Sequence, residues 1–506
     1  MKQRKYSEFV IRIIAYGILL GISTPLLALI ADSMDYPFST VACLHLSDWK
    51  LFLNTLLFSL TAIAVSTLIA LPVAYILGTF HGYLGRFLGL LLISPIMMPS
   101  YIYALLWQEM LQIADLPSEG VLVAFFIEVL VRFPLLLMAA FIGFASIPSA
   151  LLDAGKIFIH PVLYLFRVIL PLIRSHLSAG VSLSVLFSIN DYALPSVFMR
   201  HTYALEIFAR YSAVGKGGES FLYALPLIIL SILLSYILLY LVPKLSVGKH
   251  GDLGYDTVLT GPIGFDIYKI IAISVAVLQF IVPMFAILFL IIKSSVNVFT
   301  ILDIQSLQFS LIVSLLSIII VFPLAWFMAE YLYRNVSSVI WIVILFLFAL
   351  PSSMIGSGTI LFWGWTGVDF VYGHWPLLLF GYMVKLFPLF TMLIYLSIKN
   401  SDTTLWNAAL LYKNGLGLWL KVRLFLIWPG IAIAFLLGLS MTLSEIVLSL
   451  LLAPAGTTSV GIRIFNYLHY GAVDQVAYLI SIIMLLAMLW GGILYLLLTR
   501  HKSRRE

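Results

Sequence analysis

The sequence predicts an all-α polytopic membrane protein with about 12 transmembrane helices in two parallel six-helix repeats. Two observations predict the membrane: 62% of the 506 residues are hydrophobic, and only 10% are charged. Soluble domains contain about 25% charged residues, so water could not solvate a surface of this composition. A third observation, self-similarity at an offset of about half the chain, predicts the repeats.

Twelve apolar runs are long enough to cross a bilayer core, which takes about 20 helical residues. Each is predicted to be a helix, because a helix satisfies its own backbone hydrogen bonds in lipid. The first run lacks a clear cleavage site and exceeds a signal-peptide core in length, so we expect it to be an uncleaved span. The predicted spans are 9–31, 50–78, 87–108, 120–146, 168–192, 220–242, 267–293, 308–330, 338–363, 375–398, 427–452 and 475–498. Prolines are expected to break several of them, at Pro72, Pro95, Pro99, Pro134, Pro323, Pro351 and Pro388.

Lysine and arginine residues gather at both ends of the chain and in alternate loops. An even number of spans puts these segments on one side, and the positive-inside rule makes that side cytoplasmic for both termini. One predicted outer loop, 195–219, departs from this rule because it contains Arg200, Arg210 and Lys216. The net charge of +6 and the pI of about 9.1 are accounted for by topology, without a basic face for nucleic acid. The single cysteine, Cys43, excludes an intrachain disulfide.

Prolines, charged residues and small residues recur in the same order in the two halves of the chain. The matched features are Pro72 and Pro323, Arg132 and Lys385, Pro134 and Pro388, Pro171 and Pro429, and Asp191 and Glu445. The nearly constant offset predicts a first module at 1–243, a cytoplasmic linker at 244–266 and a second module at 267–506. Six spans in each module give both modules the same orientation, and parallel repeats pack about an axis along the membrane normal. We therefore expect a translocation path between the modules.

Two basic, amphipathic loops lie between the fourth and fifth predicted spans of the modules, at 147–171 and 399–429. The first contains Asp153-Ala154-Gly155-Lys156 and ends at Ile169-Leu170-Pro171. The second contains Asn407-Ala408-Ala409 and Gly415, and ends at Ile427-Trp428-Pro429. This pattern resembles the EAA loop of the type I ABC importer permeases, the inner-membrane components of binding-protein-dependent transport systems. Asp153 and Asn407 stand where the family has glutamate, and the first loop has Ile159-His160 where the family has glycine.

The resemblance extends over both modules. The segments Ser188–Ala193 and Val460–Tyr467 are similar to the branch with two fused permease halves, which serves iron(III), thiamine, phosphonates and related small charged solutes. The resemblance implies that each loop forms a coupling helix docked on an ABC ATPase subunit. The implied partners are two copies of that ATPase and a solute-binding protein on the outer face, at a bacterial inner membrane. Selectivity would reside largely in the binding protein.

The sequence contains no Walker A motif. Gly215-Lys216-Gly217 and Gly248-Lys249-His250 lack the upstream glycine and the following Ser or Thr of a phosphate cradle. There is also no hydrolytic triad, metal-ligand spacing or dinucleotide-binding turn. We therefore expect no catalytic residue, metal or cofactor in this chain, with ATP and Mg²⁺ bound by a partner subunit.

Charged residues inside predicted spans are candidate functional residues, because burying a charge in lipid is unfavourable. Glu128 and Arg132 are spaced to pair on one helix face. Lys385 occupies the place of Arg132 in the second module, without an acid four residues earlier. Asp191 and Glu445 end the fifth spans, where they either line the path, gating it or attracting a cation, or are hydrated carboxylates outside the bilayer.

Two other functions stay open. Twelve spans in parallel halves also suit an ion-coupled secondary transporter, for which Asp191 and Glu445 are the available coupling sites. A polytopic membrane enzyme would require a cluster of acids, histidines or metal ligands, and the sequence shows none. The two acids favour a cationic solute, whereas the basic loop at 195–219 favours an anionic one.

Overall fold

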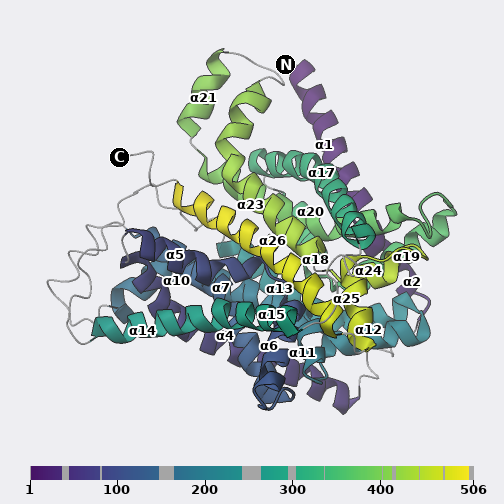
Figure 1. Ribbon diagram of the computed structural model, residues 1–506. Coiled ribbons are helices and arrows are strands. Elements are labelled where there is room, and N and C mark those ends of the chain that lie inside the picture. Colours follow the sequence, from purple (N-terminus) through teal and green to yellow (C-terminus); the bar gives the residue numbers. More distant parts are fainter. Residues whose placement is uncertain are drawn as a thin grey trace. The chain divides into compact units, whose positions relative to one another are not determined.

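The computed structural model describes residues 2–36, 45–79, 82–147, 165–241, 264–293, 304–335, 337–401, 403–412, 418–443, 445–470 and 473–500. Every regular element in these ranges is helical, and no strand occurs in them (Figure 1). Packing divides the chain into two compact units that are described separately below.

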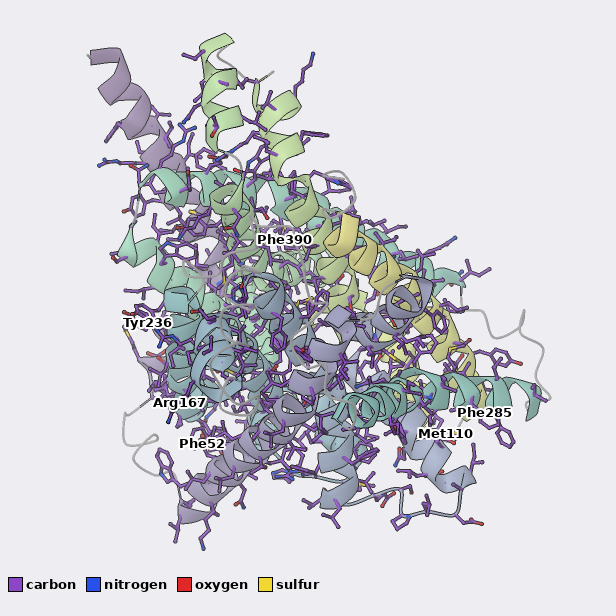
Figure 2. All side chains as sticks on the ribbon, turned by 90° about the vertical axis from the view of Figure 1, so that its left-hand side faces the viewer. Phe52, Met110, Arg167, Tyr236, Phe285 and Phe390 are labelled. Carbon is purple, nitrogen blue, oxygen red and sulfur yellow. The ribbon has the colours of Figure 1, made fainter. Side chains whose placement is uncertain are left out.

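Unit 1 consists of Met1–Leu44, Ile207–Ile232 and Asp303–Gly471. Its core is a bundle in which α20 packs on both α17 and α23. Phe390 of α20, which Figure 2 labels, is buried in this core. The helices are α1 (Lys2–Ile22), α2 (Thr24–Ser33), α17 (Ile304–Arg334), α18 (Ser338–Ala349), α19 (Ser352–Thr366), α20 (Trp375–Asn400), α21 (Thr403–Tyr412), the π-helical turn η5 (Trp419–Arg423), α23 (Leu424–Leu443), α24 (Val447–Leu452) and α25 (Val460–His469).

Unit 2 consists of His45–Glu206, Leu233–Leu302 and Ala472–Glu506. Its core is formed by α4, α7 and α10. The helices are α4 (Leu46–Thr79), α5 (Gly82–Ile93), the 3₁₀ turn η1 (Ser94–Met97), α6 (Ser100–Ile113), α7 (Val121–Ala145), the π-helical turn η2 (Leu165–Ile169), α10 (Leu170–Asn190), α11 (Ala193–Val197), α14 (Gly264–Ala276), the π-helical turn η4 (Val277–Ile281), α15 (Val282–Lys293) and α26 (Val473–Arg500). Two helices, α12 (Tyr203–Val214) and α13 (Gly217–Leu241), have residues in both units.

The units interleave the two halves of the sequence. In unit 1, α2 from the N-terminus packs on α19, and a Cβ at Gly358 would lie 2.4 Å from the carbonyl oxygen of Pro25. In unit 2, α26 from the C-terminus packs on η1, and a Cβ at Gly491 would lie 2.5 Å from Cα of Ser94. Glycine is required at both contacts, since small residues let helix backbones approach closely. The predicted modules at 1–243 and 267–506 are defined by repeated sequence rather than by packing, and their boundaries stay a prediction; the linker at 244–266 lies largely outside the described residues.

Seven described helices are each long and apolar enough to cross a membrane, and the number rises to 11 if each bent helix pair counts as one span. Apolar side chains also cover much of the outside of these helices: Leu57 and Leu68 of α4 are 58% and 70% exposed. Phe285 of α15 and Tyr236 of α13 are likewise exposed, and both can be followed in Figure 2. Lipid solvates such a surface and water does not. The chain is therefore a multi-pass helical membrane protein.

The expectation that proline breaks several spans is wrong for most of the prolines that we named. Pro72, Pro134, Pro323 and Pro388 lie inside continuous helices. Neighbouring helices in a membrane compensate for the backbone hydrogen bond that proline removes. The expectation is confirmed at Pro95, Pro99 and Pro351, since the chain turns by 109° before α6 and by 107° before α19. There Pro99 and Pro351 take the N-cap position, at which proline costs no helical hydrogen bond.

Candidate functional site

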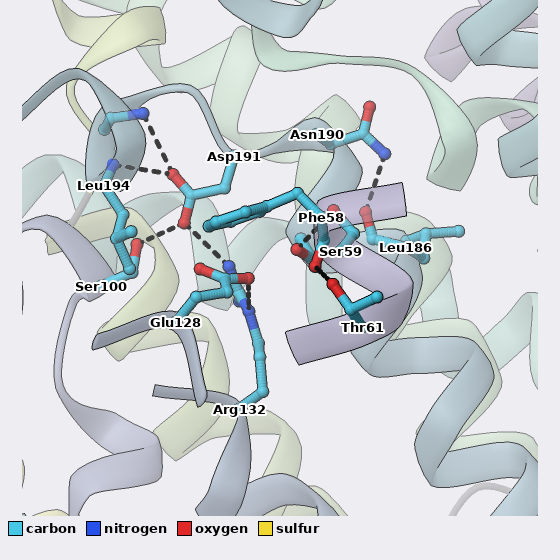
Figure 3. A network of polar contacts seen from close by, with 12 residues as sticks. Phe58, Ser59, Thr61, Ser100, Glu128, Arg132, Leu186, Asn190, Asp191 and Leu194 are labelled. Carbon is cyan, nitrogen blue, oxygen red and sulfur yellow. Dashed lines mark hydrogen bonds and ion pairs between the residues drawn. The ribbon is translucent and has the colours of Figure 1, made fainter. Parts of the chain in front are cut away.

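The predicted pathway residue Asp191 belongs to a buried polar cluster in unit 2, which we call the Asp191 cluster: Ser100, Glu128, Arg132 and Asp191. Arg132 Nε lies 2.7 Å from Glu128 Oε1, which confirms the expected pairing on one face of α7. Arg132 Nη2 lies 3.0 Å from Asp191 Oδ2, and the Ser100 hydroxyl donates to the same oxygen at 2.6 Å (Figure 3). One guanidinium therefore joins two carboxylates.

The backbone around Asp191 explains why the carboxylate points into the cluster. Helix α10 ends at Asn190, and Asp191 adopts an extended conformation with φ −84° and ψ 114°. Its Oδ1 accepts hydrogen bonds from the backbone N–H groups of Ala193 (3.0 Å) and Leu194 (3.2 Å), as an N-capping side chain does (Figure 3). Asp191 thus holds the junction between α10 and α11 and presents its other oxygen to Arg132.

Glu445 belongs to a matching group in unit 1, the Glu445 cluster: Ser352, Lys385 and Glu445. Lys385 of α20 forms an ion pair with Glu445 and donates to the Ser352 hydroxyl at 2.7 Å. The Glu445 Oε1 accepts a hydrogen bond from the N–H of Leu448 at 3.4 Å, at the start of α24. Lys385 therefore has an acidic partner 60 residues away along the chain, whereas the acid that pairs with Arg132 on α7 is four residues away.

The three positions of the Glu445 cluster match three of the Asp191 cluster. Ser100 and Ser352 each begin a helix directly after a bend at proline. We did not single out either serine from the sequence, although the recurring Pro-Ser pairs, 252 residues apart, are a signal that could have identified them. A short helix follows each acid, at the same offset of 254 residues. Each cluster thus ties a bend, a long helix and a helix junction together within its own unit.

Burial makes these clusters chemically significant. The Arg132, Asp191 and Glu445 side chains are 8%, 12% and 8% exposed. Charges at such depth are stable only when paired. Neither acid is a freely hydrated helix-end carboxylate. That they line a translocation path stays a prediction. No group of three or more potential metal-binding side chains occurs in the described part of the chain.

Three basic residues of the loop at 195–219 departed from the expected charge distribution, and each has a local partner in the structure. The Arg200 guanidinium lies 3.5 Å from the centroid of the Phe58 ring, and that of Arg210 lies 3.8 Å from the Tyr223 ring. Lys216 Nζ lies 3.9 Å from Glu219 Oε2. Burial lowers the pKa of Arg200, and the attraction of the Glu128 charge opposes that shift. These contacts weaken the argument that the loop selects an anionic solute.

The predicted coupling loops are described only in part. Asp153, Ala154, Gly155 and Lys156 of the first loop lie outside the described residues, as does Gly415 of the second. Pro171 is exposed near the start of α10, and Pro429 lies in α23, at a bend of 62°. The second loop contains α21, on which Asn407 and Ala408 are exposed and Ala409 is half-buried.

Within unit 1, α21 lies at the opposite end from α24 and α25 (Figure 1). It also carries exposed apolar side chains, of which Leu405 is 57% and Leu411 89% exposed. Its other face is covered, because Trp406 is only 8% exposed. The helix therefore presents small and apolar side chains outward from one end of its unit.

Searches for similar proteins add no further assignment. No protein-family model matches the chain, and no curated protein sequence matches it either.

Proposed function

We propose that the chain is the permease subunit of an ATP-driven ABC importer, with two fused modules of six spans each. It would form the translocation path for a small charged solute such as iron(III), thiamine or a phosphonate. Two copies of an ABC ATPase subunit and a solute-binding protein would be its partners, in a bacterial inner membrane with both termini cytoplasmic. The chain itself would hydrolyse nothing and bind no cofactor.

The recurrence of elements supports two modules. The series α4, α6, α7, α10, α11, α12 and α13 finds a counterpart in α17, α19, α20, α23, α24, α25 and α26, in the same order. Each of these helices begins 252 to 258 residues before its counterpart. The Asp191 and Glu445 clusters occupy corresponding points of the two series. Chance similarity of apolar helices does not reproduce buried ion pairs at the same junctions.

The observation that carries the proposal is α21. It is a short helix between α20 and α23, at the position where the resemblance puts a coupling helix. Its exposed side chains, Asn407, Ala408 and Leu411 among them, form a small and largely apolar face that lies open in the described part of the chain. A separate subunit is the natural occupant of an apolar face at the end of a membrane protein. Movement of such a subunit would rock one module against the other and open the path to each side in turn.

The test is to purify the full chain in detergent from its native membrane and to identify what accompanies it. We expect an ABC ATPase that is lost in Ala408→Arg, because a long charged side chain on the exposed face of α21 blocks docking. Thr366→Arg, an exposed position far along the chain from α21, serves as a matched control and should retain the ATPase. Uptake by the lone chain under an ion gradient would refute the proposal and favour an ion-coupled transporter.

The same preparation can test whether Asp191 and Glu445 line the translocation path. If Asp191 and Glu445 line the path, Asp191→Asn combined with Glu445→Gln should lower solute uptake at an unchanged rate of ATP hydrolysis. Unchanged uptake in reconstituted vesicles would leave both acids with a purely structural role.

A further inference from the structure

Arg423 is one of the most deeply buried large side chains described, with 2% of its side chain exposed. It is the last residue of η5, directly before α23. Its Nε lies 2.6 Å from Oε1 of Glu330 on α17, and its Nη2 lies 3.4 Å from Oε2. This is the two-point pairing in which a guanidinium holds a carboxylate most firmly. Arg334, one turn later on α17 and half exposed, lies 4.0 Å from the same carboxylate.

Besides the ring of Tyr333 on α17, whose centroid lies 5.7 Å from its guanidinium carbon, Arg423 contacts two further segments. Its Nη1 donates to the hydroxyl of Ser401, which caps the end of α20, at 3.3 Å. Its guanidinium carbon lies 4.7 Å from the ring centroid of Trp406 on α21, within the range of a cation–π interaction. One cation therefore touches α17, the end of α20 and α21, besides its own turn before α23.

These contacts act on the covered face of α21. The helix has only ten residues, and isolated helices of that length are marginal in water. Its orientation must therefore come from tertiary contacts, and the buried Trp406 provides one. A buried ion pair is rigid because breaking it leaves an uncompensated charge. The ring of Trp406 therefore packs against the guanidinium of Arg423, whose position the ion pair with Glu330 fixes.

The repeated positions in the first half do not carry this arrangement. Counted back by 251 residues from Glu330 and by 254 from Trp406 and Arg423, the first copy has Thr79, Leu152 and Ile169; counted by the 258 of the Pro171–Pro429 match, it has Leu165 for Arg423. None of these residues can form an ion pair. The arrangement of acid, cation and aromatic ring is therefore a feature of the second copy that the repeat alone does not predict.

We infer that Glu330, Arg423 and Trp406 form a clamp that fixes α21 to the helix bundle, so that the second coupling helix moves with α17, α20 and α23 as one body. Arg423 and Glu330 are positioning residues, since they act on α21 through Trp406. The first copy lacks these three side chains at the matched positions, so the two coupling contacts differ in sequence there. The role of α21 in coupling rests on the proposed function, whereas the clamp itself does not.

The direct test is hydrogen exchange of the purified full chain, read from peptides that cover α21 at Thr403–Tyr412. In Arg423→Met, we expect exchange in α21 to accelerate about tenfold or more, since local opening no longer breaks an ion pair. The matched control is Lys421→Met, which removes an exposed cation from the same turn and should leave α21 unchanged. Unchanged exchange in a folded Arg423→Met variant would overturn the clamp.

Two variants keep the test decisive if Arg423→Met fails to fold. Trp406→Leu removes the aromatic contact and keeps the ion pair, and should also accelerate exchange in α21. The exchanged pair Glu330→Arg with Arg423→Glu keeps an ion pair but places a carboxylate against the ring of Trp406, so exchange in α21 should stay fast, as in Arg423→Met. Wild-type exchange in folded Trp406→Leu would overturn the clamp as well.

A functional measurement separates the clamp from the proposed function. In vesicles that contain the whole transporter, Trp406→Leu should lower the solute transported per ATP at least about threefold, with ATP hydrolysis retained. An unchanged ratio would refute the role of the clamp in coupling and leave the permease proposal intact. If no ATPase accompanies the wild-type chain, the proposed function fails, and hydrogen exchange still decides whether the clamp exists.

Discussion

The Asp191 cluster of unit 2 and the Glu445 cluster of unit 1 occupy matching places but use different chemistry. In unit 2 a guanidinium joins two carboxylates, whereas in unit 1 an ammonium serves one carboxylate and a serine. The difference follows from one neighbouring position. Gly381 stands where the first copy has Glu128, and a Cβ at Gly381 would lie 2.4 Å from Cδ1 of Leu452.

This comparison explains the identity of each cation. A rigid fork with five donors can serve two acids at once, and a single ammonium on a flexible stem suits one acid. Where glycine replaces the second acid, lysine is sufficient. Both clusters contain a buried ion pair. Only the Asp191 cluster has a second carboxylate, and this second acid explains why its cation is arginine rather than lysine.

The largest effect is expected from removing the shared cation of the Asp191 cluster. Arg132→Met leaves Glu128 and Asp191 buried without the cation that pairs with both, and breaking a buried pair costs about 3–5 kcal/mol of stability. Thermal unfolding of the detergent-purified chain should show a large drop in midpoint or the loss of folded protein. Arg174→Met, at an exposed position of α10, is the control and should behave as wild type. Equal stability of the two variants would contradict this account of the cluster.

Removing the cation of the Glu445 cluster should cost less. Lys385→Met leaves a single buried acid, and the lysine side chain is 22% exposed, so we expect about 2 kcal/mol. Adding Glu445→Gln should recover most of the loss, because no unpaired charge then remains. A double variant as unstable as Lys385→Met would show that the pair does not act through charge.

Exchanging the two cations should have unequal effects. Arg132→Lys cannot serve both carboxylates and should cost about 1–2 kcal/mol, whereas Lys385→Arg should change stability by less than about 1 kcal/mol. Both variants keep the charge of the chain, so each controls for the other in the same unfolding assay. Equal effects of the two exchanges would remove the distinction between the clusters.

Small effects are also expected from the serines that begin α6 and α19. Ser100→Ala and Ser352→Ala each remove one hydrogen bond to a charged group that keeps other partners, so we expect about 1 kcal/mol for each. Thermal unfolding measures both changes against Thr366→Ala, an exposed position at the end of α19. Losses above those of the cation variants would mean that the serines, and not the ion pairs, hold the bends.

Local features of the sequence determined that this is a helical membrane protein and where most helices lie. Runs of about 20 apolar residues set the spans, because in lipid a segment must be a helix to satisfy its backbone. Charged residues inside those runs marked Arg132, Lys385, Asp191 and Glu445 as special. The i,i+4 pair of Glu128 and Arg132 could be predicted because it lies on one helix.

Only the tertiary structure decided which segments meet. Lipid-facing and buried faces are both apolar, so hydropathy carries no signal that α2 packs on α19 or that α26 packs on η1. Nor does it indicate that Lys385 pairs with an acid 60 residues away, or that Arg423 pairs with Glu330, 93 residues earlier in the chain. Ion-pair partners in a membrane protein depend on which helices become neighbours, and packing and close glycine contacts determine those neighbours.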